Sequence, residues 1–241
     1  MEGPSIHLLQ EELHDFIGQS IKDVSGNARF DKAPLVKQTI KDIYAFGKRL
    51  IIQLDTRALV IHFLMYGSYR VDEPRSGMAP RLALITTKHA LYLYNCSVKC
   101  LEAANLKDTL PLEQDILSAE WNSAHTIKAI KQHPQQTIDD VLLDQDIFAG
   151  VGNIIKNEVL FMSGVSPQTK VVDLSAKKIK EITLNARAFS QRFLELRKIF
   201  QLKKNLQIYR KKVCPVCGFA IIRQKTGARK RWSFFCSHCQ H

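Results

Sequence analysis

Four cysteines near the C-terminus constrain the fold of this chain more than any other feature. They form two Cys-x-x-Cys pairs, Cys214/Cys217 and Cys236/Cys239, separated by a short basic and aromatic segment. Four thiolates at this spacing can complete a tetrahedron around one zinc ion. Four buried cysteines or a redox pair are the alternatives, but two pairs placed in this way favour zinc. Because the protein would fill all four ligand positions, we expect one structural Zn²⁺ ion with no hydrolytic role.

The charge balance points to a polyanionic partner. The 241 residues include 35 Lys and Arg against 23 Asp and Glu, which gives a net charge of +12. Such an excess favours nucleic acid, and the alternative is a basic surface without such a partner. Cys96 and Cys100 are the two cysteines outside the pairs, and the spacing does not resemble a disulfide framework. The sequence shows neither an apolar run of membrane-spanning length nor a signal-peptide pattern, so we expect a cytoplasmic protein that does not bind membranes.

The hydrophobic periodicity changes along the chain. It predicts a helix over Pro4–Ile17, followed by close-set strands over Arg49–Leu54, Ala58–Phe63, Ser68–Val71, Arg81–Thr86 and Ala90–Tyr94. Strands joined by short turns indicate an antiparallel β-sandwich or barrel. After Leu110 helical spacing predominates, over Pro111–Trp121, His125–Gln132, Thr137–Leu143, Asn153–Met162 and Ser175–Leu202. Thr137 and Asp140 form a plausible capping pair for the third of these helices.

The predicted fold class is therefore α+β with several domains. We expect an N-terminal helix and β-sandwich domain over 1–109, a helical domain over 110–208, and a zinc finger built on a β-hairpin over 209–241. A short basic segment, Ile208–Lys212, would link the last two. The hairpin would place the basic segment Arg223–Arg231 at the end of the molecule.

Three shorter motifs could carry chemistry, and each has a structural alternative. Gly150-Val151-Gly152-Asn153 precedes a helix whose free N–H groups suit a phosphate, but it would equally serve as a packing turn. Lys48 follows Gly47 at the start of a strand, where a solvated surface lysine is common. The large side chains from His62 to Gly67 suit a core strand, or a wedge inserted into a base stack.

In combination, these motifs resemble the formamidopyrimidine-DNA glycosylase/endonuclease VIII family of base-excision-repair enzymes. The resemblance runs through nearly the whole chain in the family's order. The matching pieces are Glu2-Gly3-Pro4, Gly47-Lys48, His62–Gly67, Gln145–Asn153, Glu158–Phe161, Tyr209 and Arg231–Gln240. It implies a β-sandwich domain, a helix–two-turn–helix domain and a zinc finger, with damaged double-stranded DNA held in the cleft between the halves and the damaged nucleotide flipped out.

The resemblance also implies roles for individual residues. Leu64, Met65 and Tyr66 match the side chains that fill the hole left by the flipped nucleotide. Asn153 and Arg231 match residues that grip phosphates around the lesion, and the arginine is also credited with helping the second elimination step. In addition, Lys48 matches a proton donor near the sugar, and Glu2 matches the acid that protonates the sugar ring or the departing base.

The chain departs from the family pattern at its first residue. The family nucleophile is an N-terminal proline, whereas this sequence reads Met1-Glu2-Gly3-Pro4 and Met1 occupies the position of the proline. Glu2 is too large for normal removal of Met1, so we expect the α-amine of Met1 to form the imine with the sugar carbon. Its pKa of roughly 7.7–8.0 leaves a neutral, nucleophilic fraction at pH 7.

Further features separate the two branches of the family. The opening Glu-Gly-Pro, the closing Cys-Gln-His and the short stretch between the Leu196 helix and Tyr209 resemble the endonuclease VIII branch, which favours oxidised pyrimidines as substrates. Ser5 stands where relatives carry a second carboxylate. Leu64 is apolar where that branch often has an amide side chain.

The sequence therefore predicts a monomeric DNA glycosylase and abasic-site lyase that removes oxidised bases and cuts the strand by β/δ-elimination. A bacterial, nucleoid-associated protein of the cytoplasm fits this function. The first alternative is a lesion-binding or abasic-site-binding protein of the same fold that lacks efficient catalysis because the proline is absent. The second is an unrelated zinc-ribbon protein that binds nucleic acid, which does not explain the ordered matches at Glu2, Lys48 and Asn153.

Overall fold

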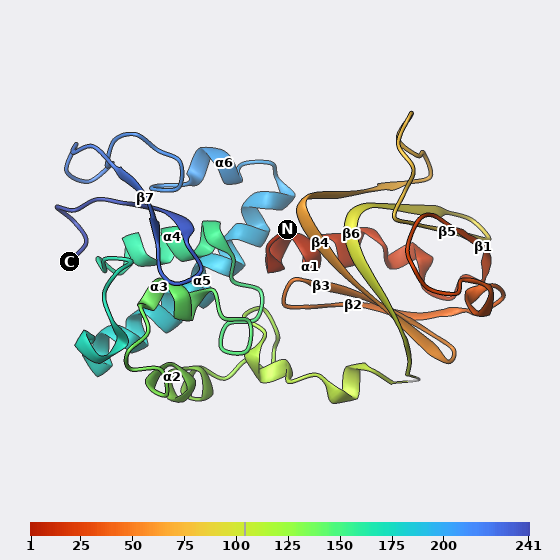
Figure 1. Ribbon diagram of the computed structural model, residues 1–241, viewed down its shortest axis with the longest axis horizontal. Coiled ribbons are helices and arrows are strands. Elements are labelled where there is room, and N and C mark those ends of the chain that lie inside the picture. Colours follow the sequence, from red (N-terminus) through yellow and green to blue (C-terminus); the bar gives the residue numbers. More distant parts are fainter. Residues whose placement is uncertain (104) are drawn as a thin grey trace. The chain divides into compact units, whose positions relative to one another are not determined.

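The computed structural model describes residues 1–103 and 105–241 and divides the chain into two compact units (Figure 1). Unit 1 contains Met1 and Ser5–Leu110. Unit 2 contains Glu2–Pro4 and Pro111–His241, so the chain passes between the units within its first five residues. The finer division into three domains, at 1–109, 110–208 and 209–241, stays a prediction.

Unit 1 is built on one antiparallel sheet with the strand order β1-β5-β6-β4-β3-β2. Its strands are β1 (Ile21–Ser25), β2 (Ile40–Phe46), β3 (Arg49–Leu54), β4 (Arg57–Val71), β5 (Leu82–Thr86) and β6 (Ala90–Glu102). β4 and β6 are the longest and lie at the centre of the strand order, as Figure 1 shows. Helix α1 (Gly3–Glu12) precedes the sheet.

Apolar side chains from both ends of this sheet meet in a single core, so the sheet folds over as a β-sandwich. Ile21 of β1 and Leu84 of β5 belong to the same buried cluster as Ile43 of β2 and Ile52 of β3. The cluster also includes Ile6 of α1, which fits the apolar spacing of that helix. The β-sandwich predicted for the N-terminal domain is confirmed.

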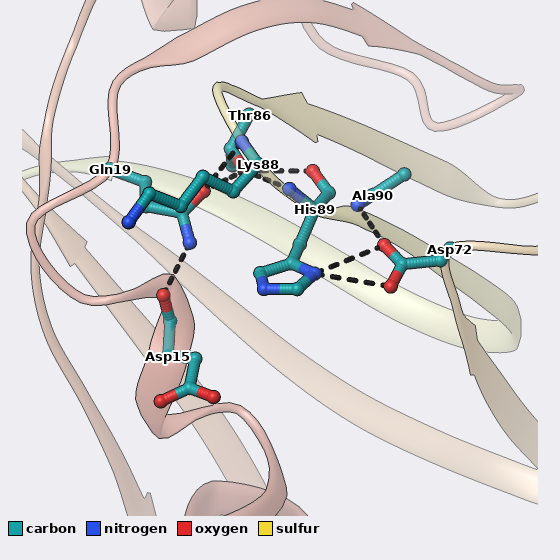
Figure 2. Close-up of polar contacts among 7 residues, drawn as sticks. All are labelled: Asp15, Gln19, Asp72, Thr86, Lys88, His89 and Ala90. Carbon is teal, nitrogen blue, oxygen red and sulfur yellow. Dashed lines mark hydrogen bonds and ion pairs between the residues drawn. The ribbon is translucent and has the colours of Figure 1, made fainter.

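A polar cluster joins three loops of the sandwich (Figure 2). The Gln19 side-chain oxygen accepts hydrogen bonds from the Thr86 hydroxyl and, at 3.0 Å, from the Lys88 amide. The Asp72 carboxylate accepts from the Ala90 amide at 2.9 Å and pairs with the His89 ring at 3.1 Å. These bonds hold the connection before β1 and the end of β4 against the β5–β6 turn.

Unit 2 combines helices with a C-terminal hairpin. The helices are α2 (Ser123–Lys131), α3 (Ile138–Leu142), α4 (Asn153–Met162), α5 (Ala176–Lys198) and α6 (Leu202–Asn205), and the hairpin strands are β7 (Ile222–Thr226) and β8 (Arg231–Phe235). Val159 of α4, together with Ile182 and Phe189 of α5, lies in the main core of the unit.

Both units also contain short 3₁₀ helices. They occur at His14–Phe16, Ala33–Leu35, Lys107–Thr109, Leu112–Gln114 and Val171–Asp173.

Several predicted boundaries in the first unit are wrong for identifiable reasons. Helix α1 ends at Glu12 and is followed by a 3₁₀ turn, instead of continuing to Ile17. The separate strands predicted over Ala58–Phe63 and Ser68–Val71 are one strand, β4, interrupted by a bulge. β1 and β2 are absent from the prediction.

The helix predicted over Pro111–Trp121 is also wrong. This segment contains only a short 3₁₀ turn, because its backbone is bonded elsewhere in the unit. The Ile116 amide donates to the Ala149 carbonyl at 3.0 Å, and the Ala149 amide donates to the Gln114 carbonyl at 3.1 Å. Pairing with the segment before α4 thus replaces the internal bonds of a helix.

At the start of α3, Thr137 is not a side-chain cap. Its hydroxyl donates to Asp139 and Asp140, whose carboxylates also bind the distant hairpin. The Thr137 hydroxyl and the Asp140 carboxylate, which we predicted to cap the helix, are thus engaged in other contacts. Throughout the described residues, no helix combines the length and apolar character needed to cross a membrane.

Candidate DNA-repair site

The four cysteines of the C-terminal segment converge as the spacing predicts. Their sulfur atoms all lie within 4.8 Å of one another. The Cys214 and Cys239 sulfurs are 3.8 Å apart, and those of Cys217 and Cys236 are 3.4 Å apart. A tetrahedral zinc site with Zn–S bonds of about 2.3 Å has sulfur–sulfur separations of about 3.8 Å. The four thiols therefore fit the ligand set of one zinc ion.

One of these thiols is prepared for deprotonation. Burial alone would raise the pKa of Cys214, but backbone N–H groups of Cys217 and Val216, together with neighbouring thiols, lower it to about 7. Thiolates bind zinc, and a bound metal lowers a thiol pKa further. In the same cluster the pKa of Cys239 is raised, chiefly by its contact with the Cys217 thiol, so Cys214 loses its proton more readily than Cys239.

In unit 1, the N-terminal amine lies in the same neighbourhood as Lys48 and His62. The His62 ring nitrogen contacts the Lys48 carbonyl at 3.2 Å. Burial lowers the pKa of His62, and the charges of the N-terminal amine, Lys48 and Arg49 lower it further. The imidazole is therefore neutral at pH 7. It lies within the electric field of the Met1 α-amine and the Lys48 ammonium group, the two amines that we predicted to take part in the reaction.

The predicted wedge residues lie in a bulge of β4. Phe63 pairs with Cys96 and Ser68 pairs with Tyr94, so residues 64–67 of β4 stand opposite Asn95 alone. Leu64, Met65 and Tyr66 are consequently pushed out of the sheet, with exposed fractions of 47%, 66% and 89%.

The backbone enforces this bulge. Tyr66 has a φ of 65°, a conformation that bulky residues adopt rarely. The Asn95 side chain donates a hydrogen bond to the Met65 carbonyl. A Cβ on Gly67 would lie 2.7 Å from the Asn95 carbonyl oxygen, so only glycine fits there. Three large side chains are thus presented to solvent by a conformation that costs free energy.

In unit 2, Glu2 is held at the N-terminus of α4. Its carboxylate accepts hydrogen bonds from the Ile154 amide at 2.6 Å and the Ile155 amide at 3.2 Å. The helix dipole further favours a negative charge at this position. A Cβ on Gly152 would lie 2.3 Å from the Glu2 carboxyl carbon, so the glycine makes room for the acid. These two N–H groups therefore bind Glu2 in this structure, and not the phosphate that the glycine motif suggested.

One face of α4 also fixes the strand that carries Arg231. The Trp232 carbonyl accepts hydrogen bonds from three side chains: Asn153 at 3.0 Å, Lys156 at 3.4 Å and Asn157 at 3.4 Å. These residues are spaced i, i+3 and i+4, which places them together on a helix. Arg231 itself is exposed at the start of β8. The backbone immediately after Arg231 is therefore anchored to the same helix that holds Glu2.

Lys156 is a fully buried cation at the centre of this contact. Its ammonium group donates to the Ser233 hydroxyl at 2.7 Å. Burial lowers its pKa to about 8; the charges of Asp139, Asp140 and Glu2 oppose this shift, whereas Arg231 adds to it. The lysine thus lies within the electrostatic reach of both Glu2 and Arg231.

Two acids of α3 hold the hairpin turn and the end of β7 that leads into it. The Thr226 hydroxyl is hydrogen-bonded to Asp139. The Asp140 carboxylate accepts from the backbone amides of Ala228 and Arg229, at 2.5 Å and 3.2 Å. The hairpin is therefore attached to the helical core along its length.

The predicted linker Ile208–Lys212 is also attached. The buried Glu158 carboxylate accepts the backbone amides of residues 207, 208 and 209 at 2.8–3.0 Å. Tyr209 then packs edge-on against Phe234 of β8, with ring centroids 5.1 Å apart. Glu158 and Tyr209, which carry part of the family resemblance, therefore have a structural function.

The predicted site residues thus form two groups, one in each unit. Met1 and Lys48 belong to unit 1 together with the wedge residues, whereas Glu2, Asn153 and Arg231 belong to unit 2. Sequence reasoning missed Lys156 and Asp139, and it assigned Asp140 to a helix cap instead of the hairpin contact. The signal for Lys156 was its helical spacing from Asn153 and Asn157, which places these three polar side chains on one face of α4.

Comparison with known proteins identifies the class and then the family. Residues 112–202 match the model described as the formamidopyrimidine-DNA glycosylase H2TH domain, so this part of unit 2 is a helix–two-turn–helix module. Residues 2–97 match the formamidopyrimidine-DNA glycosylase N-terminal domain. The two matches are adjacent and cover most of the chain. The chain belongs to the formamidopyrimidine-DNA glycosylase/endonuclease VIII family.

Individual relatives come from both branches of this family. Endonuclease 8-like 3 of Mus musculus is 34% identical over 205 residues, which are 82% of this chain and 34% of that protein. Endonuclease 8-like L720 of Acanthamoeba polyphaga mimivirus is 26% identical and covers 100% of this chain and 99% of its own. The formamidopyrimidine-DNA glycosylase of Syntrophomonas wolfei is also 26% identical, over 99% of both chains. The chain spans about a third of the length of the first relatives it matches.

Solved structures share the fold along the whole chain. The crystal structure of a viral DNA glycosylase has a TM-score of 0.88 at 23% identity and covers 100% of both chains. The formamidopyrimidine-DNA glycosylase of Lactococcus lactis, bound non-covalently to DNA containing an abasic site, has a TM-score of 0.86 at 23% identity, again over 100% of both chains. These similarities confirm the predicted α+β fold.

Proposed function

We propose that this protein is a base-excision-repair DNA glycosylase and abasic-site lyase. It removes oxidised bases, with pyrimidines favoured, and then cuts the strand by β/δ-elimination. One observation carries the proposal: the carboxylate of Glu2, next in sequence to residue 1, is held by two backbone N–H groups at the N-terminus of α4, where Gly152 leaves room for it. Family membership is the second support.

In the proposed reaction, the neutral α-amine of Met1 attacks the C1′ carbon of the damaged nucleotide. The bond from C1′ to the base breaks, the base leaves with a proton, and Glu2 supplies the acid and base function at the sugar. Loss of the amine proton and opening of the sugar ring give a C1′ imine. Loss of a C2′ proton then expels the 3′ phosphate (β-elimination), and loss of a C4′ proton expels the 5′ phosphate (δ-elimination). Water finally hydrolyses the imine, which releases the sugar fragment and the Met1 amine.

The remaining residues bind DNA or transfer protons. Lys48 donates a proton on the sugar side, and Arg231 grips a phosphate of the lesion with its forked guanidinium group. Asn153 contributes a phosphate contact, although one of its amide hydrogens is already bonded to Trp232. Leu64, Met65 and Tyr66 fill the space left by the flipped nucleotide, which fits their exposure on the bulge of β4.

The proposed cofactor is one structural zinc ion held by the four cysteine thiolates, and it takes no part in the reaction. It stiffens the segment that follows β8. The proposed partner is damaged double-stranded DNA, bound by a monomer. We also propose a reducing, DNA-containing compartment such as the bacterial cytoplasm, which would keep the thiols reduced for the metal.

The test uses duplexes that carry a single oxidised pyrimidine, a single oxidised purine or a single abasic site. The wild-type protein should release the base and cut the strand, with the oxidised pyrimidine preferred. Glu2→Gln should retain DNA binding and lose base release, because it removes the acid but keeps a similar shape. Absence of base release and of strand cutting from every duplex would refute the enzyme proposal.

The alternative function is a lesion-binding or abasic-site-binding protein with little catalysis. The specific observation behind it is the absence of proline from the first residues, Met1-Glu2-Gly3. Tight binding of the abasic-site duplex without incision would support this alternative. Intact-mass measurement of the purified protein is part of the same experiment, because it establishes which residue carries the free α-amine.

A further inference from the structure

The corner after α5 has a backbone conformation that its residue does not favour. The Phe200 amide donates to the Arg197 carbonyl at 3.2 Å, and the Gln201 amide donates to the Leu196 carbonyl at 2.8 Å. This pair of bonds is a Schellman motif, whose residue after the cap is usually glycine. Phe200 occupies that position with a φ of 58°. A large aromatic residue here is strained relative to glycine.

Packing does not compensate this strain within the corner. The Phe200 side chain is 91% exposed, and the neighbouring Ile199 is 62% exposed. Apolar side chains gain stability only when they are removed from water. Phe200 therefore destabilises the corner in two ways, through its strained backbone and through the exposure of its ring to water, and no local contact among the described residues offsets these effects. Such costs persist where they serve a function.

The residues around Phe200 carry a dense positive charge. Arg197 and Lys198 end α5, and Lys203 and Lys204 lie in α6, which begins two residues after Phe200 (Figure 1). All four side chains are exposed, and the eight residues from Arg197 to Lys204 include no acid. We call this segment, residues 197–204, the α5–α6 corner. Its charge complements a polyanion.

We propose that the α5–α6 corner is a DNA contact in which the Phe200 ring stacks on an unpaired nucleobase. The flanking cations would lie against the adjoining phosphates. Proteins that bind unpaired strands combine a positive surface with aromatic rings on which bases stack, and the corner has both elements. A duplex base is already covered on both faces, so the contact requires a base that lacks a partner. The choice of DNA as the polyanion rests on the proposed function.

The decisive variant is Phe200→Gly, because its two expected effects have opposite directions. Glycine relieves the positive φ, so the melting temperature should rise by about 2–4 °C, the shift that 1 kcal/mol produces in a chain of this size. At the same time, affinity for an unmodified thymine oligonucleotide should fall roughly 5- to 100-fold, the range of losing one base–aromatic stack. Affinity for an intact duplex of mixed sequence should remain unchanged.

Two controls separate stacking from strain. Phe200→Tyr keeps a flat ring and should retain the wild-type affinity for the oligonucleotide. Lys37→Gly relieves a similar positive φ of 72° at an exposed position of unit 1. It should raise the melting temperature without the selective loss of single-strand affinity.

Three results would overturn this inference. The first is unchanged oligonucleotide affinity in Phe200→Gly, and the second is a lower melting temperature, which would show that the ring serves packing. The third is Phe200-dependent binding to vesicles of phosphatidylserine and phosphatidylcholine without Phe200-dependent binding to DNA. Imine formation with abasic-site DNA is measured separately on the wild type and on Phe200→Gly. If neither protein forms the imine, the proposed chemistry is refuted. A selective loss of single-strand affinity in Phe200→Gly would even then support the α5–α6 corner as a DNA contact.

Discussion

The bulge of β4 and the α4–β8 contact carry the residues that we propose for DNA binding, and they present these residues in contrasting ways. In the bulge, the backbone is strained and Leu64, Met65 and Tyr66 project into solvent. In the α4–β8 contact, buried and half-buried side chains hold the backbone beside Arg231, and the Arg231 side chain itself is exposed. The contrast teaches that wedge residues can be exchanged at little cost to folding, whereas the clamp depends on the integrity of unit 2.

Loss of the proposed zinc ion should have the largest effect, because it should disrupt the hairpin that carries Arg231 and leave the β4 bulge intact. Cys236→Ser removes one ligand of the proposed zinc site, and chelation removes the ion; the four cysteines flank the hairpin on both sides and are buried or half-buried. Structural zinc contributes on the order of 10 kcal/mol to such modules, so the hairpin should unfold. Zinc content, circular dichroism and strand cutting measure the outcome. Cys100→Ser, outside the cluster, is the matched control; a Cys236→Ser protein with a folded hairpin and normal cutting would contradict the structural role.

Gly152→Ala should have the next largest effect, and on catalysis. The added Cβ would lie 2.3–2.4 Å from the Glu2 side chain, so the carboxylate must leave the α4 N-terminus. Base release should fall roughly 10²- to 10⁴-fold, the usual contribution of a positioned acid or base. Gly18→Ala controls for added side-chain bulk, because nothing lies within 4 Å of its Cβ, although its φ of 82° makes it mildly destabilising. Equal losses of base release in the two variants would argue against the role of Gly152.

Lys156→Met should change the pH dependence of stability. The folded pKa of Lys156 is about 8, below the ordinary value of 10.5, so the unfolded chain binds more protons between these values. Stability of the wild type should therefore gain up to about 3 kcal/mol from this group as the pH rises from 8 to 10.5. Denaturant unfolding at several pH values measures this gain. The Met variant should lack it, and identical pH profiles for both proteins would contradict the assignment.

Tyr66→Ala should have the smallest effect on folding. Its side chain is almost fully exposed, so the free energy of unfolding should change by no more than about 0.5 kcal/mol. Release of a damaged base from duplex DNA should nevertheless slow, because the hole beside the flipped nucleotide is no longer filled. Release from a single strand provides the control, since it requires no such filling. A large loss of stability would show that the bulge depends on Tyr66 for packing.

The sequence predicted parts of the molecule whose causes are local. Helix α4 was predicted with its observed bounds, because its apolar period begins directly after Gly152. The cysteine cluster was predictable from spacing, because thiol ligands of one metal must lie close together. The predicted roles of residues 64–66 and of Glu2 came from the family resemblance. The exposure of residues 64–66 and the binding of Glu2 at the N-terminus of α4 are findings of the structure.

Other parts depended on contacts between distant segments. The N–H groups at the start of α4 bind Glu2, about 150 residues earlier, which periodicity cannot reveal. Asp140 was predicted to act within a cap, but it binds the hairpin turn near Ala228. Lys156 is buried where it donates to Ser233 of β8, and its spacing within α4 does not reveal that a strand 77 residues later covers this face of the helix.

The central claim is that the α-amine of residue 1 is the nucleophile, and borohydride trapping tests it most directly. The protein, with its N-terminus established by intact mass, is reduced with borohydride in the presence of abasic-site DNA, digested, and mapped by tandem mass spectrometry. Our account predicts one sugar adduct on the Met1 α-nitrogen. An adduct on the Lys48 side chain, or no covalent adduct at all, would contradict it.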